Sequence, residues 1–234
     1  ITHDRAPPPT KASRRFLHEY ITSLLSIHQF PHADLVKGKM VVHEVGRPIH
    51  ASGVKEPTLQ WVPPPPGWTK LNTDGSFVQT TGAAGGGMVL RNEKGELIFT
   101  ACRQLFTCNN SLQAELEACR EGLQLALHRT NMPILVELDS TEAVSMLSAQ
   151  SANRSQVRAL VEEIRGIVAI ESRDISYSHI SRSQNNVSHA LAAYGRSTPR
   201  TAVWVQSSLD CIVNLSKAEK PPWLNEIYLY LAKK

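Results

Sequence analysis

The stretch Thr69-Lys70-Leu71-Asn72-Thr73-Asp74-Gly75-Ser76-Phe77 predicts a β-strand that carries a carboxylate directly before a glycine. We expect Asp74 to end this strand and to project from the edge of a sheet. Gly75 would then let the backbone turn at no steric cost. An Asp-Gly pair is also a common turn, so this feature alone assigns no function.

The segments that follow predict a mixed α/β fold. Further strands are expected at 85–90, 97–105, 134–138 and 175–180, and helices at 112–129, 140–148, 155–170 and from about 185. The first two of these strands would be joined by a hairpin at 92–95. This order indicates a mixed sheet with helices packed against its faces.

Composition divides the 234 residues into three parts. Ten of the fourteen prolines fall within residues 1–66 and end in the run Pro63–Pro66, which favours an extended spacer. We therefore predict an N-terminal flanking segment with a proline-rich linker (1–67), a domain (68–198) and a C-terminal extension (199–234).

The two flanking segments carry weaker patterns. Apolar spacing within Arg14–Phe30 predicts one amphipathic helix, but no catalytic pattern is present there. Residues 1–60 are left as a candidate contact surface for a protein partner. Beyond Pro199, one packed helix is expected to include Trp204, Val205, Leu209, Ile212 and Val213.

Charge, cysteine content and hydropathy exclude several classes of protein. The net charge is +4, yet residues 68–198 carry 12 Lys and Arg against 13 Asp and Glu, which does not favour tight non-specific binding to phosphates.

The four cysteines have neither metal-ligand nor paired spacing, which indicates free thiols in a reducing compartment. No apolar run is long enough for a membrane span. We expect an intracellular monomer, in the nucleus or cytoplasm, with an organelle left open.

Glu115 is the second candidate site residue. On the predicted helix it lies at the margin of an apolar stripe, whereas Glu117 and Glu121 fall on the opposite side and are expected to be solvated. A carboxylate near such a stripe loses hydration unless a partner or a metal replaces it. The alternative is a glutamate that extends from the edge of the stripe into water.

Asp139 is the third candidate. It closes the apolar strand at 134–138 and precedes Ser140, so it could either cap the next helix or stand where α/β sheets place ligand groups. If the three acids meet, their mutual repulsion implies bound divalent cations. Oxygen ligands of this kind suit Mg²⁺, with Mn²⁺ as a substitute.

Four short motifs occur in the order and spacing of a known family. They are Thr73-Asp74-Gly75-Ser76, Gly86-Gly87-Met88-Val89-Leu90-Arg91, Ala114-Glu115-Leu116 and Leu138-Asp139-Ser140. Together they resemble the type 1 ribonuclease H family, and most closely its plant branch of retroelement-derived, reverse-transcriptase-like domains. The resemblance covers about 130 residues and leaves out the N-terminal segment.

The resemblance implies a ribonuclease H-like fold with a five-stranded mixed sheet flanked by helices. It implies an endonuclease that hydrolyses the RNA strand of RNA–DNA hybrids, with Asp74, Glu115 and Asp139 as acidic metal ligands. Two ions about 4 Å apart would then clamp the scissile phosphate. The alternative is a domesticated domain, weakly active or inactive, that binds nucleic acid or a protein partner.

The last motif departs from the family pattern. His189, in Asn185-Asn186-Val187-Ser188-His189, stands where a fourth acid is expected, and it either reaches the cleft as a ligand or is an ordinary exposed histidine. An imidazole adds no negative charge, so the second Mg²⁺ should bind more weakly. The resemblance also assigns His179 a role in proton transfer or product release, which is chemically reasonable for an imidazole, although His179 could simply end a strand.

Substrate contacts are expected from four amide side chains, Asn109, Asn110, Gln113 and Asn185. Amides suit the 2′-hydroxyl and sugar contacts that separate RNA from DNA. Asparagines before a helix are also common caps, and that alternative stays open.

Overall fold

The predicted strands join into one mixed β-sheet. The structure is a computed structural model that describes residues 59–106, 108–149, 155–198, 201–208, 212 and 214–216. Its strands are β1 (Thr69–Phe77), β2 (Ala84–Arg91), β3 (Leu97–Leu105), β4 (Ile134–Leu138), β5 (Ile175–His179) and β6 (Ala202–Val205). They lie in the order β5-β4-β1-β2-β3-β6; β1, β4 and β5 are parallel, and β1, β2, β3 and β6 pair antiparallel. The α/β class and the mixed sheet are confirmed.

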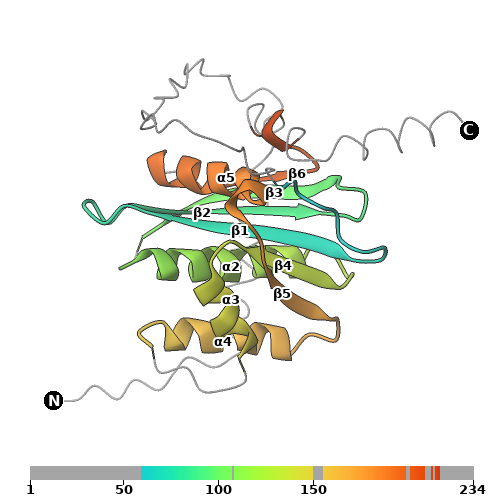
Figure 1. Ribbon diagram of the computed structural model, residues 1–234, viewed down its shortest axis with the longest axis horizontal. Helices are drawn as coiled ribbons and strands as arrows, with labels where there is room; N and C mark the ends of the chain where they lie inside the picture. Colours follow the sequence, from blue (N-terminus) through green and yellow to red (C-terminus); the bar gives the residue numbers. More distant parts are fainter. Residues whose placement is uncertain are drawn as a thin grey trace, which may run out of the picture. The chain divides into compact units, whose positions relative to one another are not determined.

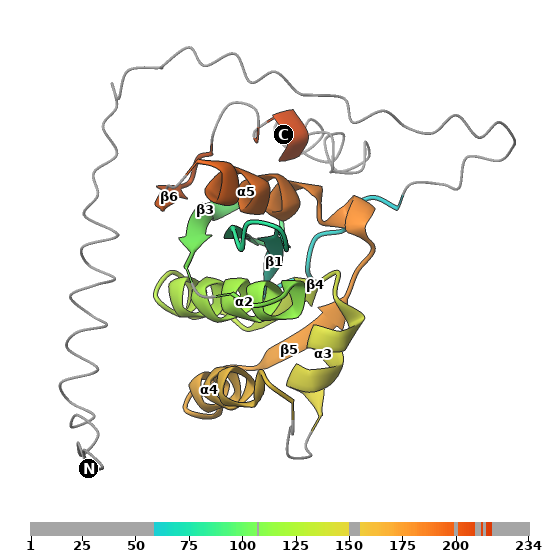
Figure 2. The same ribbon diagram turned by 90° about the vertical axis from the view of Figure 1, so that its left-hand side faces the viewer.

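Helices cover both faces of this sheet. They are α2 (Ser111–Leu127), α3 (Thr141–Ser148), α4 (Arg158–Ala169) and α5 (Asn186–Ser197). α2, α3 and α4 lie on one side and α5 on the other (Figures 1 and 2). The sheet therefore has two packed faces, and side chains alternate between them: Met88 belongs to the core with α2, and Val89 to the core with α5.

The sheet has a sixth strand that the sequence analysis missed. β6 pairs with β3, with Thr100 opposite Trp204, so the expected helix through Trp204 and Val205 is wrong. The run Ala-Val-Trp-Val is rich in β-branched and aromatic residues, which suit a strand, and its pairing satisfies the backbone of β3 that would otherwise form an open edge. Ile212 is buried beside Val89, whereas Leu209 and Val213 lie outside the described residues.

In the segment before β1, Trp61 is packed against the sheet. Trp61 is fully buried, and its indole N–H donates to Asn72 Oδ1 at 2.9 Å. The guanidinium of Arg91 lies 4.4 Å from the centre of the Trp61 ring, and the ammonium of Lys70 lies 5.4 Å from it. The domain boundaries stay predictions, and the expected helix at Arg14–Phe30 lies outside the described residues.

The far side of α2 is less exposed than its sequence suggests. Glu121, expected in water, is buried and pairs with Arg103 at 2.6 Å and Arg120 at 3.1 Å, because the helix lies against a basic residue of β3. Arg120 also binds Glu117 at 2.7 Å. These ion pairs replace the hydration that both carboxylates were expected to keep.

The cysteines and the helices of the described residues bear on the predictions about thiols and membrane spans. Cys102, Cys108 and Cys119 are buried and form no disulfide among the described residues, while Cys211 lies outside these residues. None of the helices in the described ranges has the length and apolar composition that crossing a membrane requires.

Candidate active site

The register of β1 and β4 brings Asp74 and Asp139 together. The two parallel strands pair from Thr69 opposite Ile134 to Asn72 opposite Glu137. Each acid follows two residues after that last pair, at equivalent positions. Because side chains alternate with a period of two, both carboxylates point to the same face as Asn72 and Glu137. They therefore meet where β1 and β4 cease to pair.

Asp74 lies within β1 rather than at its end, which corrects the expectation. β1 continues to Phe77 because it stays paired with β2, with Asp74 opposite Gly87. Gly75 is extended and makes no turn; it is required because α2 passes close to it. A Cβ at Gly75 would lie 2.2 Å from the backbone nitrogen of Glu115.

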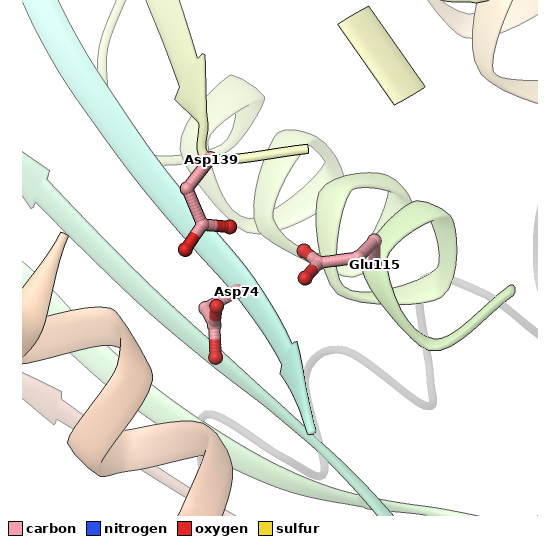
Figure 3. A group of neighbouring side chains, drawn as sticks. All are labelled: Asp74, Glu115 and Asp139. Carbon is pink, nitrogen blue, oxygen red and sulfur yellow. The ribbon is translucent and has the colours of Figure 1, made fainter. Parts of the chain in front are cut away.

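Because α2 passes so close to Gly75, Glu115 lies beside β1 at the site. Its Oε2 accepts a hydrogen bond from the backbone N–H of Gly75 at 3.0 Å, so the carboxylate turns toward the sheet instead of into water. Oxygens of Asp74, Glu115 and Asp139 all lie within 4.8 Å of one another. Figure 3 shows the three side chains converging from β1, α2 and the end of β4.

Asp139 is left free for this cluster because its neighbour caps the next helix. Ser140 is the N-cap of α3, and its Oγ accepts from the backbone N–H of Ala143 at 3.2 Å. The capping alternative for Asp139 is therefore wrong. The cleft at the cluster has a volume of about 450 Å³. Its charged lining comprises the three acids, Glu142 and Arg182, together with His189.

The surroundings of the cluster raise the pKa of two of its three carboxyl groups. Burial, followed by repulsion from Asp74 and Asp139, raises the pKa of Glu115 to about 9, although the Gly75 hydrogen bond and Arg182 act in the opposite direction. Burial and the charge of Asp74 also raise the pKa of Asp139 above its ordinary value. A divalent cation would remove both penalties, because it favours the charged carboxylates.

The raised pKa of Glu115 predicts how stability depends on pH when metal is removed. The unfolded chain releases this proton near pH 4.5, whereas the folded chain keeps it to about 9. The folded state binds more protons over that interval, so its stability falls as pH rises. We expect Mg²⁺ to raise the thermal midpoint more at about pH 8 than at about pH 5.5.

The matched variant for this measurement is Glu115→Gln, which cannot titrate. In EDTA it should lose less stability than the unmodified chain between those two pH values, and Mg²⁺ should stabilise it little. Identical pH profiles of the thermal midpoint for the two proteins would contradict the assignment of the pH-dependent stability to Glu115.

His189 reaches the cleft. Its Nδ1 lies 3.1 Å from Asp74 Oδ2, and its side chain is 36% exposed. The view that α5 presents this histidine to the acids agrees with the structure, while its role as a metal ligand stays a prediction.

His179 ends β5, as the structural alternative held, and lies beside the cluster. Its Nε2 is 3.2 Å from the backbone oxygen of Asp139, and the residue is exposed. An exposed imidazole next to Asp139 can exchange protons with solvent. Its part in catalysis stays a prediction.

The amides before α2 form a cap. Asn110 Oδ1 accepts from the backbone N–H of Gln113 at 2.8 Å, and Gln113 Oε1 accepts from the backbone N–H of Asn109 at 3.0 Å. These bonds fix the first turn of α2, which carries Glu115 two residues later. The structure shows this positioning role, and substrate contact by the three residues stays a prediction.

Asn185 has a different surrounding from the other three amides. It is buried, its Nδ2 donates to the backbone oxygen of Thr73 at 3.0 Å, and its Oδ1 accepts from Ser188 Oγ. It therefore ties the start of α5 to β1 directly beside Asp74. With its amide engaged in this way, Asn185 positions the site; a contact with substrate stays a prediction.

Arg182 is the residue that sequence reasoning missed. It lines the cleft, and its Nη2 lies 3.1 Å from His189 Nε2. The signal was present, because Arg182 lies three residues after His179 and seven before His189. Because His179 and His189 were both assigned to the site, the segment that joins them, which contains Arg182, could also have been expected to lie near it.

The donor set fits a hard divalent cation. Three carboxylates converge, so the site offers oxygen ligands, and the burial and mutual repulsion that raise the pKa of Glu115 to about 9 would be relieved by a bound cation. Asp74, Glu115 and Asp139 would hold the ion.

Comparison with known proteins agrees with this geometry. Residues 72–195 match the model of a family described as reverse transcriptase-like. An Arabidopsis thaliana protein named as a ribonuclease H protein is 28% identical over 146 residues, which cover 61% of this chain and 23% of that relative. The chain therefore spans about a quarter of the length of the relative it matches.

Solved structures show the same fold. RNase H1 from the archaeon Halobacterium salinarum has a TM-score of 0.52 and 23% identity, covering 57% of this chain and 100% of its own. LC11-RNase H1, isolated from compost and solved in complex with an RNA/DNA hybrid, has a TM-score of 0.51 and 20% identity, covering 56% and 98%. Since the family match takes in more than half of the 234 residues, the chain belongs to the reverse transcriptase-like family and carries a ribonuclease H-like domain.

Proposed function

We propose that this chain is a divalent-metal-dependent endonuclease that hydrolyses the RNA strand of RNA–DNA hybrids. The observation that carries the proposal is the convergence of Asp74, Glu115 and Asp139, whose oxygens lie within 4.8 Å of one another on a ribonuclease H-like fold. The hybrid as substrate is suggested by the complex of LC11-RNase H1, which has this fold.

The proposed cofactor is Mg²⁺, with Mn²⁺ as a substitute. The three acids would hold one ion, and Asp74 with His189 would contribute to a second, weaker position. Bound ions would supply an activated water and stabilise the leaving oxygen. The Gly75 N–H keeps the Glu115 carboxylate oriented toward the cluster, and Asn185 holds β1 against α5 beside Asp74. His179, at the rim, could then pass a proton to solvent.

A panel of labelled nucleic acids tests the reaction and its specificity. The chain is incubated with an RNA–DNA hybrid, double-stranded RNA, double-stranded DNA or single-stranded RNA, in Mg²⁺, Mn²⁺ or EDTA. We expect internal cuts in the RNA strand of the hybrid, in either metal and not in EDTA. Binding of the hybrid without cleavage in either metal would favour the alternative, a weakly active or inactive nucleic-acid-binding domain.

His189 supports a prediction about metal preference. A neutral imidazole in place of a fourth acid weakens the second ion site, so activity in Mg²⁺ should be low relative to Mn²⁺. We expect His189→Asp to raise the cleavage rate in Mg²⁺ by about tenfold and to narrow the gap between the metals. His189→Asn, which has a similar size and no charge, is the control. Equal rates for the aspartate and asparagine variants would count against the prediction.

Several expectations remain predictions from the sequence. They are the monomeric state, the intracellular location in the nucleus, the cytoplasm or an organelle, and a protein partner for residues 1–60, a segment of which only 59 and 60 are described.

A further inference from the structure

Arg182 places a positive charge inside a cleft lined by four carboxylates. The acidic residues that line the cleft are Asp74, Glu115, Asp139 and Glu142. The positive charge of Arg182 opposes the rise in the pKa of Glu115 and of Asp139, so the guanidinium lies within electrostatic range of the cluster. Its position on the loop between β5 and α5 makes it the basic side of an otherwise acidic site.

The guanidinium is nevertheless not used in an ion pair. Arg103, Arg120, Arg158 and Arg173 each pair with a carboxylate at 2.6–2.9 Å. Among the described residues, the guanidinium of Arg182 forms hydrogen bonds to the ring of His189 and no ion pair within 4 Å of a carboxylate oxygen. A guanidinium has five N–H donors, so most of them stay available in the cleft.

The contact with His189 orients the guanidinium. Arg182 Nη2 lies 3.1 Å from His189 Nε2 and 3.3 Å from His189 Nδ1, and the same Nδ1 lies 3.1 Å from Asp74 Oδ2. A guanidinium can only donate, so a ring nitrogen of neutral His189 accepts from it. This chain of two bonds fixes Arg182 beside Asp74.

The turn that carries Arg182 is held on two sides. Arg182 begins a 3₁₀ turn closed by a capping box between Ser181 and Gln184. The segment before β1 braces it, since Ser183 Oγ donates to the backbone oxygen of Leu59 at 3.1 Å and Gln184 Nε2 donates to that of Gln60 at 2.9 Å. The guanidinium therefore projects from a supported backbone, as a binding residue requires.

We propose that Arg182 binds a backbone phosphate of the nucleic acid on the His189 side of the cleft. The fork of N–H donors left free by His189 matches the geometry of a phosphate, and a phosphate approaching three carboxylates needs a compensating positive charge. The inference rests on the proposed function only in taking a nucleic acid as the substrate. It assigns substrate binding to a residue outside the acidic cluster.

Binding in EDTA tests this separately from catalysis. The affinity of the full chain for a fluorescein-labelled RNA–DNA hybrid is measured by anisotropy over a range of KCl concentrations. The proteins compared are the unmodified chain, Arg182→Gln, Arg182→Lys and Arg158→Gln. The last is the matched control, because Arg158 lies on the exposed face of α4 and pairs with Glu162.

We expect Arg182→Gln to weaken binding by about tenfold at low salt and to reduce the slope of log affinity against log salt by about 0.7–0.9, the value for one phosphate contact. Arg182→Lys should keep the slope and lose part of the affinity, because lysine keeps the charge but not the fork. Arg158→Gln should behave as the unmodified chain. A thermal midpoint for each protein shows that folding is retained.

The outcomes separate this inference from the proposed function. If Arg182→Gln keeps the slope and the affinity of the unmodified chain, or if the unmodified chain does not bind at low salt, the phosphate contact is overturned. If the slope falls as expected but no metal supports cleavage, the contact stands and the hydrolytic function fails.

Discussion

Asp74→Asn is expected to abolish cleavage of the hybrid, with a loss of about 10³-fold or more, beyond the 10–100-fold that removal of a supporting residue costs. Asp74 is the acid that the other site residues converge on: it is 2% exposed, it clusters with Glu115 and Asp139, and it accepts from His189. Asparagine has nearly the same shape but lacks the charge that attracts a cation. The loss should therefore appear in the rate and in metal binding, with the fold retained.

The matched control is Asp174→Asn, the same chemical change at an exposed residue before β5 whose backbone oxygen, not its side chain, binds Ile134. Initial rates on a labelled hybrid in Mg²⁺ and in Mn²⁺ give the comparison, and circular dichroism checks the fold. If the Asp74→Asn variant cleaves the hybrid at a rate close to that of the Asp174→Asn control, the proposed metal site is not the origin of the activity.

Gly87→Ala is expected to destabilise the fold by about 3 kcal/mol or more. Gly87 lies on β2 directly under α5, and a Cβ there would fall 2.0 Å from the backbone oxygen of Ser188 and 2.5 Å from the backbone nitrogen of Ala192. Backbone atoms of a packed helix have no rotamer through which to escape, so α5 must move away. That movement would also displace His189 and Asn185 from Asp74.

Gly166→Ala provides a control with the opposite expected sign. Gly166 lies on the exposed face of α4, and a Cβ there meets nothing within 4 Å. Alanine in a helix interior should stabilise the chain by about 0.5–1 kcal/mol. Urea unfolding followed by circular dichroism measures both variants, and a Gly87 variant as stable as the unmodified chain would contradict the close packing of α5.

The local elements and the chemical class of the site could be predicted from the sequence because both depend on near neighbours. Alternation and helical spacing placed the first five strands and the helices α2 to α5, since burial of one face is encoded within a few residues. The acids Asp74, Glu115 and Asp139 could be chosen because each adjoins an apolar element. The sixth strand was missed because Trp204 and Val205 are strand residues only when β3 is there to pair with them.

The choice between alternatives at single residues required contacts between distant segments. Whether Asp139 caps α3 was settled by Ser140, and whether His189 is an ordinary exposed residue was settled by Asp74. Gly75 is needed for the approach of α2, not for a turn, and only the position of that helix shows this. Arg182 lies between His179 and His189 in the sequence, but only the structure shows that its side chain lines the cleft.

The sequence by itself determined the first five strands, the helices α2 to α5 and the choice of the three carboxylates, because secondary structure and hydrophobic burial follow from the order of neighbouring side chains. The tertiary structure alone decided that these carboxylates share one cleft, and that His189 and Arg182 join them from α5 and the loop before it. The physical reason is that electrostatic and hydrogen-bonding interactions depend on distance in space. Strand register and helix packing set those distances between residues that are as far apart in the chain as Asp74 and His189.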